Sequence, residues 1–366
     1  MHSQLTRIRL VAAAALALPA LAGATSPGNA PAAQARTARV VTAYVLNGGA
    51  VTPINTVTNK ALNPIPTGGS SFIMVITPNG KTVYVNGFSG GPTVIPISTA
   101  TNKPGTAIVA ARNPSALAVT PHSKTLYIAD QDSNDVIAVS TATNQTAGFV
   151  PTGEAPVAVA VTPNAATGYV ANFGDLTVTP FTVATNTPGN AIKLRRAPVR
   201  ITITPDSKTA YVGVAAGTVI PIRTATNKAL TPINVGGPAV DIAITPDSRT
   251  AYVSSSLGVT PISTATNKPG KLIKIPGGAI AITPDGKTAY VAAGSGTVTP
   301  IHTATNRPGK PIHVGASAND IAITSDGKTA YVTSNLGVTP INIATNKPGK
   351  LIKVAGGAGL IVITPG

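Results

Sequence analysis

Apolar runs and turn residues follow one another along most of the chain in a recurring pattern. The stretch Ile280–Val291 shows it, because apolar residues at both ends flank a turn made of Pro284, Asp285 and Gly286. Proline fixes φ near the value that the second position of a turn needs, and glycine tolerates the positive φ that follows. The pattern predicts two short β-strands joined by a tight turn.

A tyrosine marks the same position in every copy of this hairpin. The 8 tyrosines lie 38 to 43 residues apart, at Tyr44, Tyr84, Tyr127, Tyr169, Tyr211, Tyr252, Tyr290 and Tyr331. A single residue type confined to one phase of such a period indicates a repeat architecture. We expect these tyrosines to lie in the core of each repeat.

Each copy carries four strand signals. In the copy near Ile280 they cover Ile280–Thr283, Thr288–Val291, Thr297–His302 and Lys310–Val314, bounded by glycine, proline and asparagine. An asparagine recurs in the turn between the third and fourth strands, at Asn59, Asn102, Asn144, Asn186, Asn227, Asn267, Asn306 and Asn346. A period of about 40 to 45 residues with four strands is typical of propeller blades. We therefore predict an all-β propeller.

The two ends of the repeat array complement each other. The first copy starts at its second strand, Ala43–Val45, and the last copy ends at its first strand, Leu360–Thr364. Pairing of these two strands would close a ring of eight four-stranded blades and remove the exposed edges of an open array. Seven blades with an irregular end is the alternative.

The third strand contains proline in seven of the eight copies, at Pro53, Pro96, Pro180, Pro221, Pro261, Pro300 and Pro340. Proline has no N–H to donate to a β-ladder. Either the missing N–H faces away from a partner strand, or the pairing with the fourth strand is interrupted at that point.

The tyrosine motif is similar to a known repeat. Tyr331–Ser334, Tyr169–Asn172 and Tyr84–Gly87, with turns of the Thr-Pro-Asp-Gly-Lys type before them, resemble the YVTN-family β-propeller repeat over about residues 40–366. The resemblance implies a propeller that is secreted or surface-associated, often without a known activity. Some similar propellers are lactonases, lyases or redox enzymes, but none of their catalytic motifs can be carried onto residues of this chain.

The N-terminus has the features of an export signal. Arg7 and Arg9 precede an apolar run too short to span a bilayer, so we predict a signal peptide at residues 1–24, with a retained signal anchor as the alternative. Residues 25–38 are expected to form a flexible leader and residues 39–366 a single propeller domain. We expect a secreted protein, extracellular or attached to the cell surface, with no transmembrane span in the mature chain.

The chain is strongly basic. Its formal net charge is +16, from 27 basic and 11 acidic residues. Propeller topology places the turns after the first and third strands on one face, and twelve basic residues follow these turns: Lys81, Lys124, Lys208, Arg249, Lys287, Lys328, Lys60, Lys103, Lys228, Lys268, Arg307 and Lys347. This basic face predicts docking on an anionic cell-wall polymer or an envelope protein. The alternative is that these residues keep the repeat soluble and blunt its edges.

Nucleic acid is a weaker candidate for the acidic partner. Phosphate attraction would suit the charge, but no recognition helix, aromatic interleaving or stacking platform accompanies it. We therefore do not expect a nucleic-acid-binding protein.

Three charged residues share one position at the start of the innermost strands: Arg200, Asp241 and Asp320. If they converge, they would form a ligand pocket at the mouth of the central channel, where propeller sites commonly lie. The alternative is an ion pair between Arg200 and Asp241 of neighbouring blades.

Little in the sequence supports catalysis. The chain has no cysteine, Glu154 is its only glutamate, and His122, His302 and His313 fall at three different positions of the repeat. The loop starting at Asp130 lacks the glycine and glutamate of a calcium loop. We expect no catalytic residues, metal or cofactor, and predict a monomeric, non-enzymatic binding or scaffold module. A hydrolase or lyase with its site at the channel mouth is the alternative.

Overall fold

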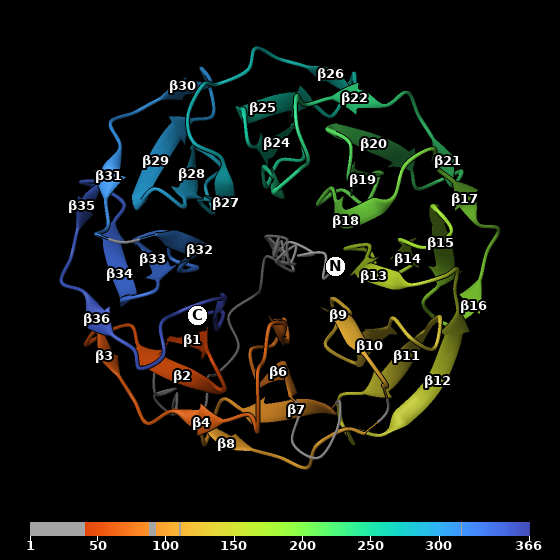
Figure 1. The fold of residues 1–366 in the computed structure, drawn as a ribbon, viewed down its shortest axis with the longest axis horizontal. Helices are drawn as coiled ribbons and strands as arrows, with labels where there is room; N and C mark the ends of the chain where they lie inside the picture. The colour runs from red at the N-terminus through yellow and green to blue at the C-terminus, as the bar shows by residue number, and fades with distance from the viewer. Residues whose placement is uncertain (1–40, 88–92, 110, 316) are drawn as a thin grey trace, which may run out of the picture.

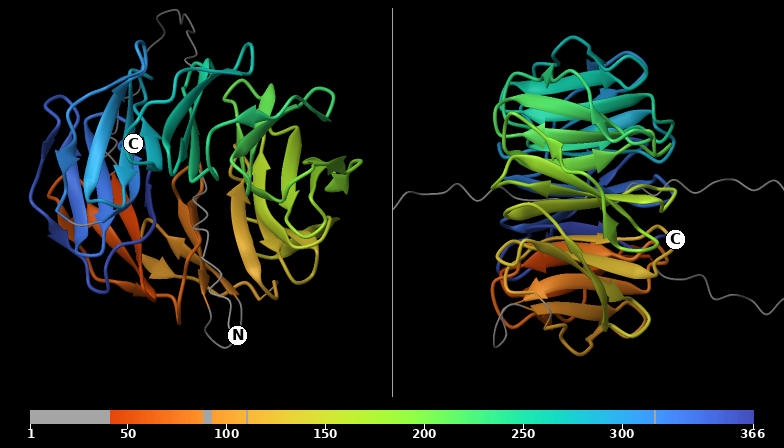
Figure 2. Two further views of the ribbon diagram at one scale, coloured as in Figure 1. Left: turned by 45° about the horizontal axis from the view of Figure 1, so that its top comes forward. Right: turned by 90° about the vertical axis from the view of Figure 1, so that its right-hand side faces the viewer.

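Eight antiparallel β-sheets stand around a central axis like the blades of a propeller (Figure 1). The computed structural model describes residues 41–87, 93–109, 111–315 and 317–366. Seen edge-on in Figure 2, the ring is a disc with the strands running across its thickness. The predicted all-β, eight-bladed fold is confirmed, and the seven-bladed alternative is wrong.

The strands of each blade lie side by side in order from the axis to the rim. The innermost strands of blades 1 to 8 are β37 (Ile361–Ile363), β5 (Met74–Ile76), β9 (Pro114–Val119), β13 (Pro156–Val161), β18 (Pro198–Ile203), β23 (Asp241–Ile244), β27 (Gly278–Ile282) and β32 (Ala318–Ile323). The second strands are β1 (Thr42–Asn47), β6 (Thr82–Gly87), β10 (Thr125–Asp130), β14 (Thr167–Asn172), β19 (Thr209–Val214), β24 (Thr250–Ser255), β28 (Thr288–Ala293) and β33 (Thr329–Ser334).

The outer half of each blade is less regular. The third strands are β2 (Ala50–Asn55), β7 (Thr93–Ser98), β11 (Asp135–Ser140), β15 (Thr177–Thr182), β20 (Thr218–Arg223), β25 (Gly258–Ser263), β29 (Thr297–His302) and β34 (Gly337–Asn342). The outermost strands are β3 (Lys60–Ala61) with β4 (Ile65–Pro66), β8 (Lys103–Pro104), β12 (Thr146–Pro151), β16 (Thr187–Pro188) with β17 (Ile192–Lys193), β21 (Lys228–Ala229) with β22 (Ile233–Asn234), β26 (Lys268–Pro269), β30 (Arg307–Pro308) with β31 (Ile312–His313), and β35 (Lys347–Pro348) with β36 (Ile352–Lys353).

The ring closes between the last and the first segments of the described chain. Strand β37 pairs antiparallel with β1, and Tyr44 lies opposite Val362. The backbone N–H of Leu46 adds a bond of 2.9 Å to the carbonyl of Leu360. Blade 1 thus takes its innermost strand from the C-terminal end, as the complementary ends of the repeat array predict.

The prolines of the third strands explain the split outermost strands. In β29, Pro300 lies opposite Tyr290, and its carbonyl accepts the N–H of Gly309 at 2.7 Å on the outer side. The N–H and C=O of one residue point to the same side of an antiparallel strand, so the missing N–H also faces the outer chain. There the chain leaves the sheet between β30 and β31, which replace the single fourth strand expected at Lys310–Val314. Of the two alternatives given for these prolines, an interrupted pairing with the fourth strand is therefore correct.

Blade 3 is the exception that supports this explanation. Its third strand has Ala138 where the other seven have proline. Ala138 pairs with Gly148, and the outermost strand β12 spans six residues without dividing in two, with a register shift between Ala138 and Val139. A residue that can donate its N–H therefore coincides with a continuous outer strand.

The recurring tyrosine joins each blade to the next. The rings are buried in hydrophobic clusters between neighbouring blades, as Tyr169 is against Ile201 and Val212. Each hydroxyl donates to Oδ1 of the turn asparagine in the following blade at 2.6 to 2.8 Å. All eight asparagines have positive φ, near 52 to 57°, which asparagine tolerates better than most residues. The prediction that the tyrosines form the core is confirmed, and their hydroxyls serve a second role.

The two kinds of turn lie together on one face. In blade 7, Gly286 has a φ of +72° and donates its N–H to the carbonyl of Thr283, as the turn prediction requires. The hydroxyl of Thr303, in the asparagine turn, donates to the carbonyl of Gly286 at 2.6 Å. Blades 2 and 5 show the same contact through Thr99 and Thr224. The cations of both turns therefore share one face of the disc.

The predicted signal peptide and the predicted leader, residues 1–24 and 25–38, lie outside the described residues. Within the described part, no helix has the length and apolarity needed to cross a membrane.

Candidate functional site

Two regions were predicted as binding sites: the start of the innermost strands and the basic face. The first holds Arg200, Asp241 and Asp320 at one register position, each opposite the residue two places after its blade's tyrosine. The three residues are only 3 to 4% exposed. Such deep burial of charged groups requires compensating partners.

Arg200 and Asp241 link three consecutive blades. Arg200 Nη1, from β18, lies 3.5 Å from Asp241 Oδ1 on β23, and Nη2 donates to the carbonyl of Val240 at 2.6 Å. Asp241 Oδ2 accepts the N–H of Ile280, on β27 of the next blade, at 2.8 Å. Oδ1 also accepts the N–H of Ile242 at 2.8 Å. The ion pair given as the alternative to a pocket is present.

Asp320 makes the corresponding link at the seam of the ring. Its Oδ2 accepts the N–H of Ile361, on β37, at 2.9 Å, and its Oδ1 accepts the N–H of Ile321 at 2.9 Å. Burial raises the pKa of Asp320 to about 7, against the lowering effect of these two N–H groups, and the charges of Asp241 and Arg200 act on it in opposite directions. Burial likewise raises the pKa of Asp241, although Arg200 opposes the shift.

These carboxylates are therefore engaged in holding blades together. A general acid or base must come within hydrogen-bond reach of the proton that it transfers. Because the side chains of Arg200, Asp241 and Asp320 are buried, they are not within reach of a molecule in the solvent. Among the described residues, no group of three histidine, cysteine, aspartate or glutamate side chains is placed to hold a metal ion. Asp130, first in the loop compared with a calcium site, accepts the backbone N–H groups of Arg112 and Asn113 at 2.8 and 2.9 Å.

The cations after the first turn of each blade are partly neutralised. Four of them lie 3.6 to 3.8 Å from an aspartate of the same turn, in the pairs Lys208–Asp206, Arg249–Asp247, Lys287–Asp285 and Lys328–Asp326. Their side chains are 81 to 85% exposed, so these pairs contribute little to stability. In the turns of Lys81 and Lys124, Asn79 and His122 replace the aspartate.

The cations after the asparagine turns differ in this respect. All six are exposed: Lys60, Lys103, Lys228, Lys268, Arg307 and Lys347. The ion pairs of the described residues involve none of them. Each begins an outermost strand, and no aspartate or glutamate occurs from the asparagine to the end of that strand in any blade. The predicted basic face therefore continues onto the rim as unneutralised positive charge.

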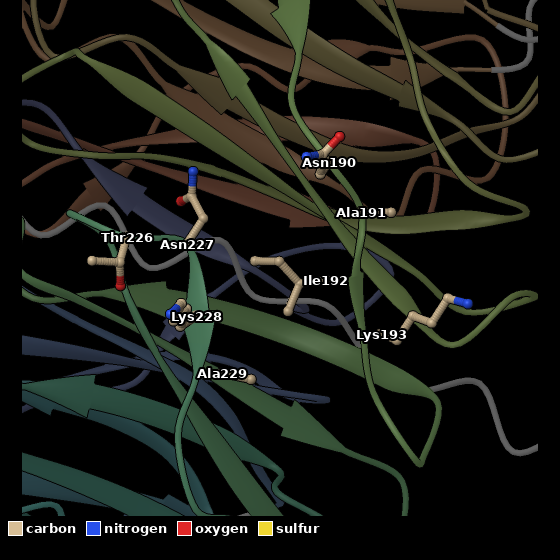
Figure 3. Close-up of a pocket in the computed structure, with 8 residues that line it drawn as sticks. All are labelled: Asn190, Ala191, Ile192, Lys193, Thr226, Asn227, Lys228 and Ala229. Carbon is tan, nitrogen blue, oxygen red and sulfur yellow. The ribbon is translucent and has the colours of Figure 1, made fainter.

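A groove of about 510 Å³ lies on the rim between blades 4 and 5 (Figure 3). Residues 190–193, ending in β17, form one wall and residues 226–229, with β21, form the other. Of the lining residues, Ile192 is buried, while Lys193 and Lys228 are exposed. Sequence reasoning missed this groove, because it arises from the separation of two outer segments and no local pattern records it.

Comparison with known proteins supports the fold alone. No protein-family model and no curated protein matches the chain. Among solved structures, hydrazine synthase of Kuenenia stuttgartiensis is similar at 20% identity and a TM-score of 0.59, over 79% of this chain and 96% of that one. The dihydro-heme d1 dehydrogenase NirN in complex with DHE is similar at 15% identity and a TM-score of 0.76, over 88% of this chain and 74% of that one. The chain is a β-propeller of eight blades.

Proposed function

We propose that the protein is a secreted propeller of the YVTN-repeat type that acts as a non-enzymatic binding or scaffold module. Its basic face adheres to an anionic polymer of the cell envelope. The eight buried tyrosines support the repeat assignment, since each is the first residue of the motif and packs between two blades. The N-terminal sequence supports export.

One observation carries the binding role. The outer segments hold exposed lysine and arginine residues without a single acidic residue among them. Solubility alone is served as well by mixed charges, which the first turns of the same blades show in their lysine–aspartate pairs. Charge of one sign over a continuous surface instead concentrates a polyanion near the protein.

The enzymatic alternative receives less support. Arg200, Asp241 and Asp320, which it would use, are buried and bonded into the links between blades. The two similar enzymes share the fold at 20% and 15% identity, and fold alone does not transfer an activity.

Cosedimentation with isolated, nuclease-treated cell envelopes tests the proposal. The chain from residue 25 should pellet with envelopes at low salt and return to the supernatant at high salt, because screening weakens contacts between exposed charges. Changing Lys60, Lys103, Lys268 and Lys347 to glutamine should reduce the bound fraction more than the same changes at the partly neutralised Lys208, Arg249, Lys287 and Lys328. Failure to pellet at low salt would refute adhesion.

A further inference from the structure

The positive charge of the rim is unevenly distributed around the ring. Over the seven residues that follow the turn asparagine, blade 6 carries Lys268, Lys271 and Lys274, and blade 8 carries Lys347, Lys350 and Lys353. Blade 7, between them, carries Arg307 and Lys310. All eight side chains are exposed. We call this set the basic arc.

The other five blades contrast with the basic arc. Their corresponding segments carry Lys60 in blade 1, Lys103 in blade 2, Lys193 in blade 4 and Lys228 in blade 5. Blade 3 has no charged residue there, because Gln145 replaces the cation after Asn144 and its outer strand is uncharged. The outer segments of these three blades therefore carry eight cations, and those of the other five blades together carry four.

The outer segments of the basic arc belong to three consecutive blades of the ring. Strand β31 of blade 7 contacts β35 of blade 8, and β36 contacts β3 of blade 1, which extends the path to Lys60. Figure 1 shows β30, β31, β35, β36 and β3 following one another along the rim. A chain lying along this edge would meet cations on three blades in succession.

Nothing in these blades neutralises the basic arc. The five acidic residues of these blades are paired with other cations or buried. Asp285 and Asp326 lie 3.8 and 3.7 Å from Lys287 and Lys328 in the first turns, and Asp320 is buried. In blade 6, Asp247 pairs with Arg249 and Asp241 pairs with Arg200. The outer segments themselves contain no acidic residue. The charge of the basic arc is therefore open to an external partner.

The composition of the basic arc indicates which chemical class of partner it would bind. Seven of the eight cations are lysines, which act as point charges on flexible stems and suit phosphate groups without demanding a fixed orientation. The large exposed apolar residues of the described parts of blades 6 to 8 are Val240, Leu257 and Leu336, so these parts offer no exposed aromatic ring on which a base could stack.

We propose that the basic arc is the docking surface for a linear polymer with a phosphate in each repeat unit and no bases. The polymer runs along the rim, so that the propeller binds edge-on with blades 6 to 8 toward it. This docking mode rests on the proposed function and assigns its partner class and its surface. Because each lysine contributes weakly, affinity depends on simultaneous contacts and rises with polymer length.

Binding of inorganic polyphosphate, followed by fluorescence anisotropy at several salt concentrations, tests the assignment. The arc variant carries Lys271→Gln, Lys310→Gln and Lys350→Gln. The matched control carries Lys103→Gln, Lys193→Gln and Lys228→Gln, which remove the same charge from outer segments of blades 2, 4 and 5. Melting curves of both variants verify that they fold. A long polyphosphate should bind the wild type more tightly than a chain of a few phosphates.

We expect the arc variant to lose about tenfold or more in affinity for long polyphosphate, and its salt slope to fall by about two to three units, as for three lost phosphate contacts. The control should change by less than about threefold on the same basis. Equal losses in both variants would overturn the arc while leaving envelope adhesion in place. Tighter binding of duplex DNA or of polyglutamate than of polyphosphate would overturn the partner class. Arc-dependent polyphosphate binding without envelope binding would refute adhesion and retain the arc.

Discussion

The hydroxyl of Tyr331 donates to Oδ1 of Asn59 at 2.7 Å, joining residues 272 positions apart. The same hydroxyl lies 3.1 Å from the carbonyl of Thr56. Every other blade makes the corresponding contact with its successor in the chain, whereas this one connects blade 8 back to blade 1. Together with the pairing of β37 with β1, it closes the ring at the rim as well as near the axis.

Removing this hydroxyl should weaken the seam. Tyr331→Phe keeps the buried ring and deletes the donor, so the free energy of unfolding should fall by about 1 kcal/mol, as for one hydrogen bond. Tyr169→Phe removes the equivalent contact to Asn227 within the array and should cost a similar amount. Urea unfolding of both variants measures the effect. Unchanged stability in both would show that the hydroxyls contribute nothing to holding blades together.

The sequence predicted the blades because each one is a local pattern. Strands, turns and the tyrosine all lie within one period, and the complementary ends required closure. The contact from tyrosine to asparagine went unpredicted, since it joins residues of different repeats and depends on how neighbouring blades are inclined. The break in the outer strands stayed open for a related reason. Both alternatives fit a proline, and only the position of the outer chain, as at Gly309, decides between them.

The charged residues near the axis show a second limit of sequence reasoning. The sequence shows that Arg200, Asp241 and Asp320 occupy the same position of the repeat. That shared position is equally compatible with lining a pocket and with linking blades. Burial and the N–H groups of Ile280 and Ile361 distinguish these roles, and both depend on the packing of strands far apart in the chain.

Breaking the link between Arg200 and Asp241 should be costly. Asp241→Ala leaves the buried guanidinium without its carboxylate and the N–H of Ile280 without its acceptor, so the free energy of unfolding should fall by about 3 to 5 kcal/mol. Lys208→Ala, which removes an exposed pair, should cost less than about 1 kcal/mol. Replacing Arg200 and Asp241 together by leucine should recover part of the loss. A small effect of Asp241→Ala in chemical denaturation would mean that the pair is not structural.

Asp320 should make stability depend on pH. Its pKa rises from 3.8 to about 7 on folding, so between these values the folded protein holds a proton that the unfolded chain has released. The contribution of Asp320 to the free energy of unfolding is therefore greatest below about pH 4 and decreases as the pH rises to about 7. Asp241, whose pKa is also raised, and Arg200 face the same region, so the change includes their coupling to Asp320.

Comparison with an asparagine variant isolates this contribution. Asp320→Asn cannot titrate, so the stability advantage of the wild type over this variant should shrink between pH 5 and pH 8. Asp326→Asn, at an exposed turn where hydrogen bonds from Thr324 and Lys328 lower the pKa, should keep a constant difference over this range. Urea unfolding at each pH provides the measurement. Parallel curves for the wild type and Asp320→Asn would contradict a raised pKa.

The continuous outer strand of blade 3 should depend on Ala138. Ala138→Pro removes the ladder donor opposite Gly148 and recreates the residue found in the other seven blades. We expect β12 to open near its centre, with loss of amide-exchange protection at Gly148 and its neighbours and a fall of about 1 kcal/mol in the free energy of unfolding. Pro300→Ala in blade 7 serves as the control and should leave protection in β30 and β31 unchanged, because there the outer chain has already left the sheet. Full protection of β12 in Ala138→Pro would mean that the outer sequence, and not the third-strand residue, decides whether the strand is split.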